Sequence, residues 1–312
     1  MALSLRKDSG RGSVGLDIDG GFLAAVQSTS DGQIQRAASV ELPAGVMADG
    51  EVGDRDALAA ALKDFFKEHS LPRSVRLGVA NQQIVVRQIE LPRIDDRDER
   101  EAAVRFQAAE AIAMPLDEAV LDHQVAGYVN SADGVERMQV VVVAARRSMV
   151  AELTEATRAA GLKPEGIDLD AFALIRALSS EVKGEDAARV HCHLAGVTNL
   201  AIAVGSACLF TRALSSPWSG EDVEGAAMAL ADEIRLSIDY YMAQPEAREV
   251  SELILSGPGS QREDLVRALE ERMGRPTRVV GALPGLQGSG IADGDDPHRF
   301  TVATGLAMGA AA

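Results

Sequence analysis

One order of secondary structure occurs twice in this chain of 312 residues. Three short apolar runs separated by Gly and Asp turns are followed by a helical pattern and a further strand-like run. One copy lies near the N-terminus and the other lies in the last third. When the copies are superposed, Asp17 falls on Cys192 and Gly21 falls on Gly196. The repeat predicts an internal duplication, with two similar lobes facing one cleft.

The composition is that of an ordinary globular protein. Hydrophobic residues make up 46% of the chain and charged residues 25%, which excludes a disordered or fibrous chain. Cys192 and Cys208 are the only cysteines, so a disulfide scaffold is excluded and a reducing compartment is favoured. Strands and helices alternate along the sequence, which indicates the α/β class.

The charge of the chain bears on its partners. A net charge of −16 repels phosphate backbones and anionic headgroups, so we expect no nucleic-acid partner and no generic binding to lipid surfaces. No stretch approaches the roughly 20 uncharged apolar residues that cross a bilayer. Residues 1–12 read as a flexible, solvated tail, with contact to lipid or to a partner as the alternative. We therefore expect a cytoplasmic protein.

Three glycine-rich turns are candidates for gripping phosphates. Unobstructed backbone N–H groups and hydroxyls bind phosphate, and a carboxylate at a strand end can order a hydrated Mg²⁺. Each turn alone is also compatible with an ordinary tight turn, but their places in the repeat favour a shared nucleotide cleft. The third turn is expected to lead into a helix opened by a capping box of Ser260 and Glu263. The candidates are Asp17, Asp19, Gly20, Gly21, Gly196, Thr198, Gly257, Pro258, Gly259 and Ser260.

Short segments spread over nearly the whole chain resemble a known family. They are VGLDI at 14–18, EAAVR at 101–105, MPLDE at 114–118, LDHQ at 121–124, AGLKP at 160–164, IDLD at 167–170, TNL at 198–200, LFTR at 209–212, EIR at 233–235, SIDYY at 237–241, LSG at 255–257 and TGL at 304–306. In this order they resemble the type IV pilus assembly protein PilM, an actin-like relative of the cell-division protein FtsA.

The resemblance implies an actin-like, two-lobed α/β fold of duplicated ribonuclease-H-like units with a small inserted α+β subdomain of the SHS2 type. The implied domains are a tail at 1–12, a first lobe at 13–83 and 163–187, the inserted subdomain at 84–162, and a second lobe at 188–312. It also implies ATP with Mg²⁺ in the cleft. Asp17 would act through a Mg²⁺-bound water, and Asn199 and Glu233 join the nucleotide-binding candidates. Asp170 is either a metal- or water-ordering group or a helix N-cap, and the N-cap is the favoured reading.

A protein partner is implied as well. In the family, the N-terminal cytoplasmic tail of the bitopic inner-membrane protein PilN lies near the junction of the inserted subdomain and the first lobe. Arg87, Leu91 and Pro92 fall in that region and are the candidate groove. The chain would then be a cytoplasmic scaffold, peripheral at the inner membrane through protein partners. Other pilus machine components and self-association are further expectations.

The candidate cleft departs from the family pattern. The first phosphate loop usually reads Asp-Ile-Gly-Ser-Ser-Ser with a following Lys, whereas here Asp19 adds a negative charge and Ala24 replaces the Lys. The second loop usually begins Asp-Ile-Gly, whereas here it begins with Cys192, and Leu194 places a Cβ where a phosphate should approach. Two like charges close together in a partly dry cleft cost several kcal/mol, as an order of magnitude. We therefore expect weak or no ATP hydrolysis, with nucleotide binding weakened or lost.

Two other functions compete with the scaffold. An FtsA-like polymerising membrane tether needs a basic amphipathic C-terminal helix, and residues 303–312 carry no Lys or Arg. An active phosphotransferase of the actin-like superfamily needs a carboxylate in the second loop, where Cys192 stands.

Overall fold

The computed structural model describes most of the chain. The predicted tail at 1–12 lies outside the described residues. The described residues are 14–29, 33–130, 134, 136–179, 187–214, 218–219, 221–244, 247–280, 291 and 295–309.

The first sheet has five strands in the order β10-β6-β1-β2-β3. Its central strand β1 runs antiparallel to β2 and parallel to β6. A hairpin therefore continues the sheet on one side, and crossover strands continue it on the other. The strands are β1 (Val14–Ile18), β2 (Phe22–Ser28), β3 (Ile34–Glu41), β6 (Ser74–Val79) and β10 (Lys163–Leu169).

The second sheet has the same layout, in the order β13-β12-β11-β14-β15. Its central strand β11 runs antiparallel to β12 and parallel to β14, as β1 does to β2 and β6. The duplication predicted from the sequence is thereby confirmed in the described part of the chain. The strands are β11 (Ala188–His193), β12 (Thr198–Val204), β13 (Ala207–Leu214), β14 (Val250–Ser256) and β15 (Thr277–Val279).

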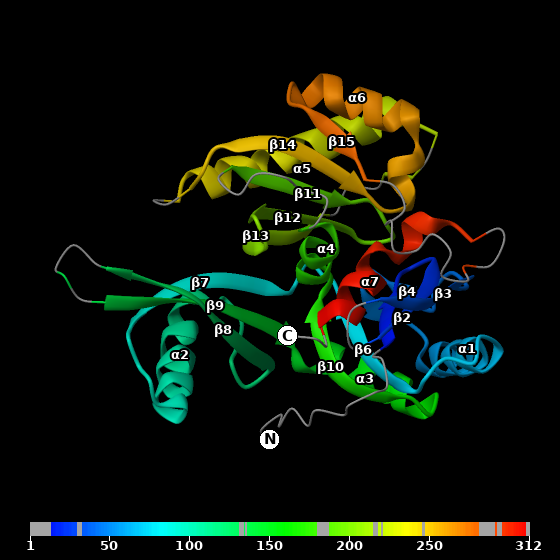
Figure 1. Cartoon of the computed structure of the whole chain (residues 1–312), viewed down its shortest axis with the longest axis horizontal. Helices are drawn as coiled ribbons and strands as arrows, with labels where there is room; N and C mark the ends of the chain where they lie inside the picture. Colours follow the sequence, from blue (N-terminus) through cyan, green and yellow to red (C-terminus); the bar gives the residue numbers. More distant parts are fainter. Residues whose placement is uncertain are drawn as a thin grey trace.

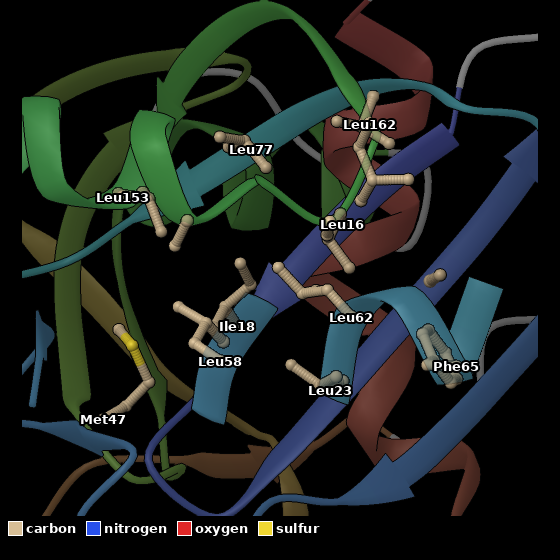
Figure 2. Close-up of a cluster of buried hydrophobic side chains, with 14 of the residues drawn as sticks. Leu16, Ile18, Leu23, Met47, Leu58, Leu62, Phe65, Leu77, Leu153 and Leu162 are labelled. Atoms are coloured by element: carbon tan, nitrogen blue, oxygen red, sulfur yellow. The ribbon is translucent and has the colours of Figure 1, made fainter. Parts of the chain in front are cut away.

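Helices α1 (Arg55–Glu68) and α3 (Arg147–Ala159) pack on the first sheet. Asp54 caps α1 by accepting a hydrogen bond from the Ala57 N–H at 3.0 Å. Leucines spaced along α1, such as Leu58 and Leu62, turn toward the sheet because they share one face of the helix. Figure 2 shows them meeting Leu16 and Leu23 from the strands, and all four are buried. Two short strands, β4 (Met47–Ala48) and β5 (Glu51–Val52), precede α1.

Two helices, α4 (Asp170–Leu178) and α7 (Thr301–Met308), lie between the two sheets (Figure 1). Their apolar residues, including Leu174 and Ala303, form a cluster with Phe22 of β2 and Ile254 of β14. Since this cluster draws on both sheets, it is the main apolar link between the lobes. A short 3₁₀ turn, η4 (Pro297–Phe300), leads into α7.

A three-stranded antiparallel sheet in the order β7-β9-β8 extends from the first lobe (Figure 1). Helix α2 covers one face of it, and Ile89, Leu91, Val104 and Val140 are buried between helix and sheet. Asp96 caps α2 by accepting hydrogen bonds from the N–H groups of residues 98 and 99. The elements are β7 (Val85–Pro92), α2 (Arg97–Ala111), β8 (Ala119–Asn130) and β9 (Glu136–Arg146).

The second sheet carries α5 (Val223–Met242) and α6 (Glu263–Met273), whose buried faces share one apolar cluster with β11 and β14. A 3₁₀ turn, η2 (Pro258–Gln261), joins β14 to α6. The predicted capping box is wrong: the residue before α6 is Arg262, and the Ser260 hydroxyl instead donates to the Gly257 carbonyl at 2.7 Å. Among the described helices, none combines the length and the apolar composition that a membrane crossing requires.

Candidate functional site

The turns after β1 and β11 meet between the two sheets. Asp19 follows β1, and its Oδ2 accepts a hydrogen bond from the Gly196 N–H, which follows β11, at 2.8 Å. Its other oxygen, Oδ1, accepts from the Gly21 N–H at 3.0 Å. A Cβ added at Gly20 would lie 4.0 Å from the Gly196 Cα. The structure thus brings together the two turns that the sequence predicted to face each other.

Asp17 and Asp170 form the buried acidic part of this region. Asp17 lies near the end of β1, and its pKa is raised by burial and by the charges of Asp170 and Asp19. The pKa of Asp170 is also raised, first by burial and then by the charges of Asp19 and Asp168. Both carboxyls therefore keep their protons to higher pH than an exposed Asp does, and a bound cation would act in the opposite direction.

Asp170 does not cap a helix, contrary to the favoured reading of the sequence. β10 runs directly into α4, so Leu169 takes the cap position and Asp170 is the first helical residue. Its Oδ1 is buried without a hydrogen-bond partner among the described residues. A Cβ added at Gly78 would lie 2.2 Å from that oxygen, so the glycine leaves the room that the carboxyl occupies. An orphaned carboxylate oxygen beside Asp17 fits a hydrated Mg²⁺, which these two residues would hold.

The third turn packs directly on the second. The Gly259 N–H donates to the Leu194 carbonyl at 2.9 Å, and the Leu194 N–H donates to the Ser256 carbonyl at 2.8 Å. A Cβ added at Gly259 would lie 2.7 Å from the Leu194 Cβ and from the Trp218 ring. The indole N–H of Trp218 donates to the Ala195 carbonyl. Backbone and indole therefore fill the space between the second and third turns.

The remaining nucleotide-binding candidates are held by contacts within the second lobe. Thr198 is buried at the start of β12, and the Asn199 amide donates to the Val197 carbonyl at 3.3 Å. Glu233 of α5 pairs with Arg212 of β13 at 3.0 Å. Pro258 begins η2, where its fixed φ suits the first helical position.

Arg299 is a functional candidate that the sequence analysis missed. Its guanidinium lies 5.1 Å from the centre of the Phe22 ring, and it pairs with Glu41 of β3. The pKa of Asp19 is raised by burial, and the charge of Arg299 partly offsets that rise. A cation therefore acts on the first turn although Ala24 replaces the family's Lys. No local pattern could have identified it, because Arg299 lies close to the other end of the sequence.

The site fits a cation better than a triphosphate. The acidic pair Asp17 and Asp170 offers oxygen ligands, but the N–H groups that would grip phosphate already bind the Asp19 carboxylate. When bound, ATP with Mg²⁺ would supply a phosphoryl group for transfer.

The predicted partner groove lies along β7, but its three residues differ in exposure. Arg87 and Pro92 are exposed, whereas Leu91 is only 7% exposed and lies in the core under α2. Leu91 faces inward because its strand partner is Met138, which is buried on the same face. Of the three predicted groove residues, Arg87 and Pro92 are therefore the two that a partner could contact. Val86 and Val143 are half-buried against the first-lobe core at this junction.

Comparison with known proteins supports the same fold. A solved PilM-PilN type IV pilus biogenesis complex is 24% identical, with a TM-score of 0.82 over 96% of this chain and 99% of that chain. The ethanolamine utilization protein EutJ from Carboxydothermus hydrogenoformans is 10% identical, with a TM-score of 0.52 over 98% and 92%. An inorganic polyphosphate/ATP-glucomannokinase from Arthrobacter sp. strain KM is 12% identical, with a TM-score of 0.50 over 96% and 98%.

At these identities, likeness to solved structures shows the fold alone: an α/β, actin-like arrangement. The family evidence comes from the sequence model for the type IV pilus assembly protein PilM, which matches residues 15–215. That span holds the first sheet except for Val14, the inserted sheet and strands β11 to β13. This chain therefore belongs to the type IV pilus assembly protein PilM family.

Proposed function

We propose that this chain is a scaffold of a type IV pilus assembly complex, binding the N-terminal cytoplasmic tail of a PilN-like membrane protein. The observation that carries the proposal is the match over 96% of the chain to a PilM protein solved with PilN. Family membership over residues 15–215 supports the same role. The chain would sit at the inner face of the membrane through this partner.

The proposed docking region is the junction between the inserted sheet and the first lobe. Val86 and Val143 supply apolar surface there, because both are only half-buried against the first-lobe core. β7 is an edge strand of the inserted sheet, and an edge strand offers backbone groups to an extended peptide. Arg87 is exposed beside Val86, and its guanidinium donates to the Val86 carbonyl at 2.9 Å.

We further propose that the nucleotide site is degenerate. The buried Leu194 and the Trp218 ring pack on Gly259, and Asp19 binds the N–H groups of the phosphate turns. Cys192 stands on β11 at the point equivalent to Asp17 on β1, so the second lobe lacks the equivalent carboxylate. The role of such a scaffold is to hold partners, and it does not require hydrolysis.

The partner proposal is tested with a synthetic peptide carrying the N-terminal cytoplasmic tail of a PilN-like membrane protein. We expect a Kd of about 1 μM by calorimetry with the full chain. Arg87→Glu should weaken binding by about tenfold, roughly 1.4 kcal/mol. The matched control is Arg105→Glu, an exposed charge reversal on α2, which should leave the affinity unchanged. A full chain that does not bind the peptide would contradict the proposal.

A charge placed at Leu91 is a poor test of the groove. Its side chain is buried among apolar residues under α2, so a carboxylate there costs folding free energy whatever the partner does. Substitutions at the exposed residues Arg87 and Pro92 can weaken binding without unfolding the protein, so they distinguish loss of binding from loss of the fold.

The degenerate site is tested by titrating ATP with Mg²⁺ into the full chain. We expect no binding below millimolar concentrations and no phosphate release above the uncatalysed rate. Submicromolar affinity with steady phosphate release would refute the degenerate site and would leave the partner proposal standing.

A further inference from the structure

The Asp19 carboxylate is bound in the way that proteins bind a phosphate. The backbone N–H groups of Gly21 and Gly196 donate hydrogen bonds to it, at 3.0 Å and 2.8 Å. Backbone N–H groups that converge on one point form an anion site whatever the source of the anion. These donors belong to the first and second turns, and the anion between them is a side chain of the same chain.

This contact joins the two sheets. Asp19 follows β1 in the first sheet and Gly196 follows β11 in the second, so a single carboxylate holds N–H groups from both lobes. A Cβ added at Gly196 would lie 2.4 Å from the Asp19 Oδ1, so only glycine admits the carboxylate at this distance.

The surroundings keep the carboxylate in place. Both of its oxygens are engaged, Oδ1 by the Gly21 N–H group at 3.0 Å and Oδ2 by the Gly196 N–H group at 2.8 Å. The positively charged guanidinium of Arg299 lies 5.1 Å from the ring centre of Phe22, the residue after Gly21.

We propose that Asp19 is a resident anion that occupies the phosphate cradle and latches the two lobes together in the absence of nucleotide. The inference rests on the proposed loss of nucleotide binding and adds what takes the nucleotide's place. The latch predicts a protein whose cleft is closed at all nucleotide concentrations. It also predicts that removing the carboxylate frees an anion site.

The test compares the full chain with Asp19→Ser, whose hydroxyl is too short to span the two turns. The control is Asp64→Ser, which removes one exposed carboxylate from α1 and gives the same net charge. Two signals report on the cleft. The rate of hydrogen exchange at the Gly196 amide reports on its hydrogen bond to Asp19. Fluorescence quenching reports on the solvent exposure of Trp218, the only tryptophan of the chain.

In Asp19→Ser we expect the Gly196 amide to exchange about tenfold faster and quenching of Trp218 to rise, because both are released when the turns part. High inorganic phosphate should slow that exchange again in Asp19→Ser and leave the other two proteins unchanged. Asp64→Ser should match the unaltered chain throughout.

Unchanged exchange and quenching in Asp19→Ser would overturn the latch. Faster exchange that phosphate does not reverse would overturn the assignment of the cradle as an anion site. If Asp19→Ser does not fold, Asp19→Asn decides, since it keeps the shape but loses one acceptor oxygen and the charge. Its Gly196 amide should exchange several-fold faster, as an order of magnitude, and an unchanged rate would overturn the latch. ATP binding by the unaltered chain would instead count against the degenerate site.

Discussion

Gly305 of α7 lies directly against the backbone of Ala173 in α4. A Cβ added at Gly305 would come within 1.8 Å of the Ala173 carbonyl oxygen, much closer than any real Cβ approaches an oxygen. These two helices lie between the two sheets (Figure 1) and carry the apolar cluster that joins the lobes. Their close approach therefore sets the spacing of the lobes.

Gly305→Ala should lower the free energy of unfolding by about 1–3 kcal/mol, because the helices must move apart to admit the methyl group. The matched control is Gly127→Ala on β8, where an added Cβ meets nothing within 4 Å. That variant should stay within about 0.5 kcal/mol of the unaltered chain in urea unfolding. Equal stability of both variants would show that α4 and α7 do not pack as described.

Asp17 makes the stability of the protein depend on pH. Its pKa in the folded state is raised by burial and by neighbouring carboxylates, so the folded protein holds this proton to higher pH than the unfolded chain does. Its contribution to stability is therefore full below the unfolded pKa and is lost as the pH rises through the folded pKa.

Asp17→Asn removes this loss, because the amide does not ionise. We expect the variant to match the unaltered chain at about pH 4 and to exceed its free energy of unfolding at about pH 8. Chemical unfolding at a series of pH values gives the difference. Asp64→Asn on the exposed face of α1 is the control and should show no such trend. A variant that becomes relatively less stable with rising pH would contradict the burial of an acidic pair.

Cys192 should be inert in the folded protein. It lies on the central strand β11 with no exposed surface, and burial raises the pKa of its thiol to about 12. Because the thiolate is the reactive form, iodoacetamide should modify Cys192 at least about tenfold more slowly in the folded than in the urea-unfolded chain. Cys208→Ser isolates this residue for mass spectrometry. Equal rates in the two states would mean that β11 is not closed off by β12 and β14.

The fold could be predicted well because both copies of the repeat show the same local patterns. Alternating apolar runs and glycine turns recur in the same order, so Asp17 on Cys192 and Gly21 on Gly196 could be aligned without coordinates. The two sheets repeat one strand order, which confirms that reading. The meeting of the first and second turns followed from the same symmetry.

The predictions that failed or missed a contact depend on residues far apart in the chain. Arg299 acts on Asp19, and Trp218 packs on Gly259, through contacts that periodicity does not record. Leu91 was predicted to line the groove because the sequence does not show which face of β7 packs against α2. In the structure, the face that carries Leu91 is the buried one. The N-cap reading of Asp170 failed because β10 continues to Leu169 without a loop.

The proposed scaffold would bind its partner with a cleft that needs no nucleotide. The most direct measurement is titration of the PilN-like tail peptide into the full chain, first without nucleotide and then with ATP and Mg²⁺. The account predicts the same Kd, about 1 μM, in both titrations. Peptide binding that appears only when ATP and Mg²⁺ are present would contradict it.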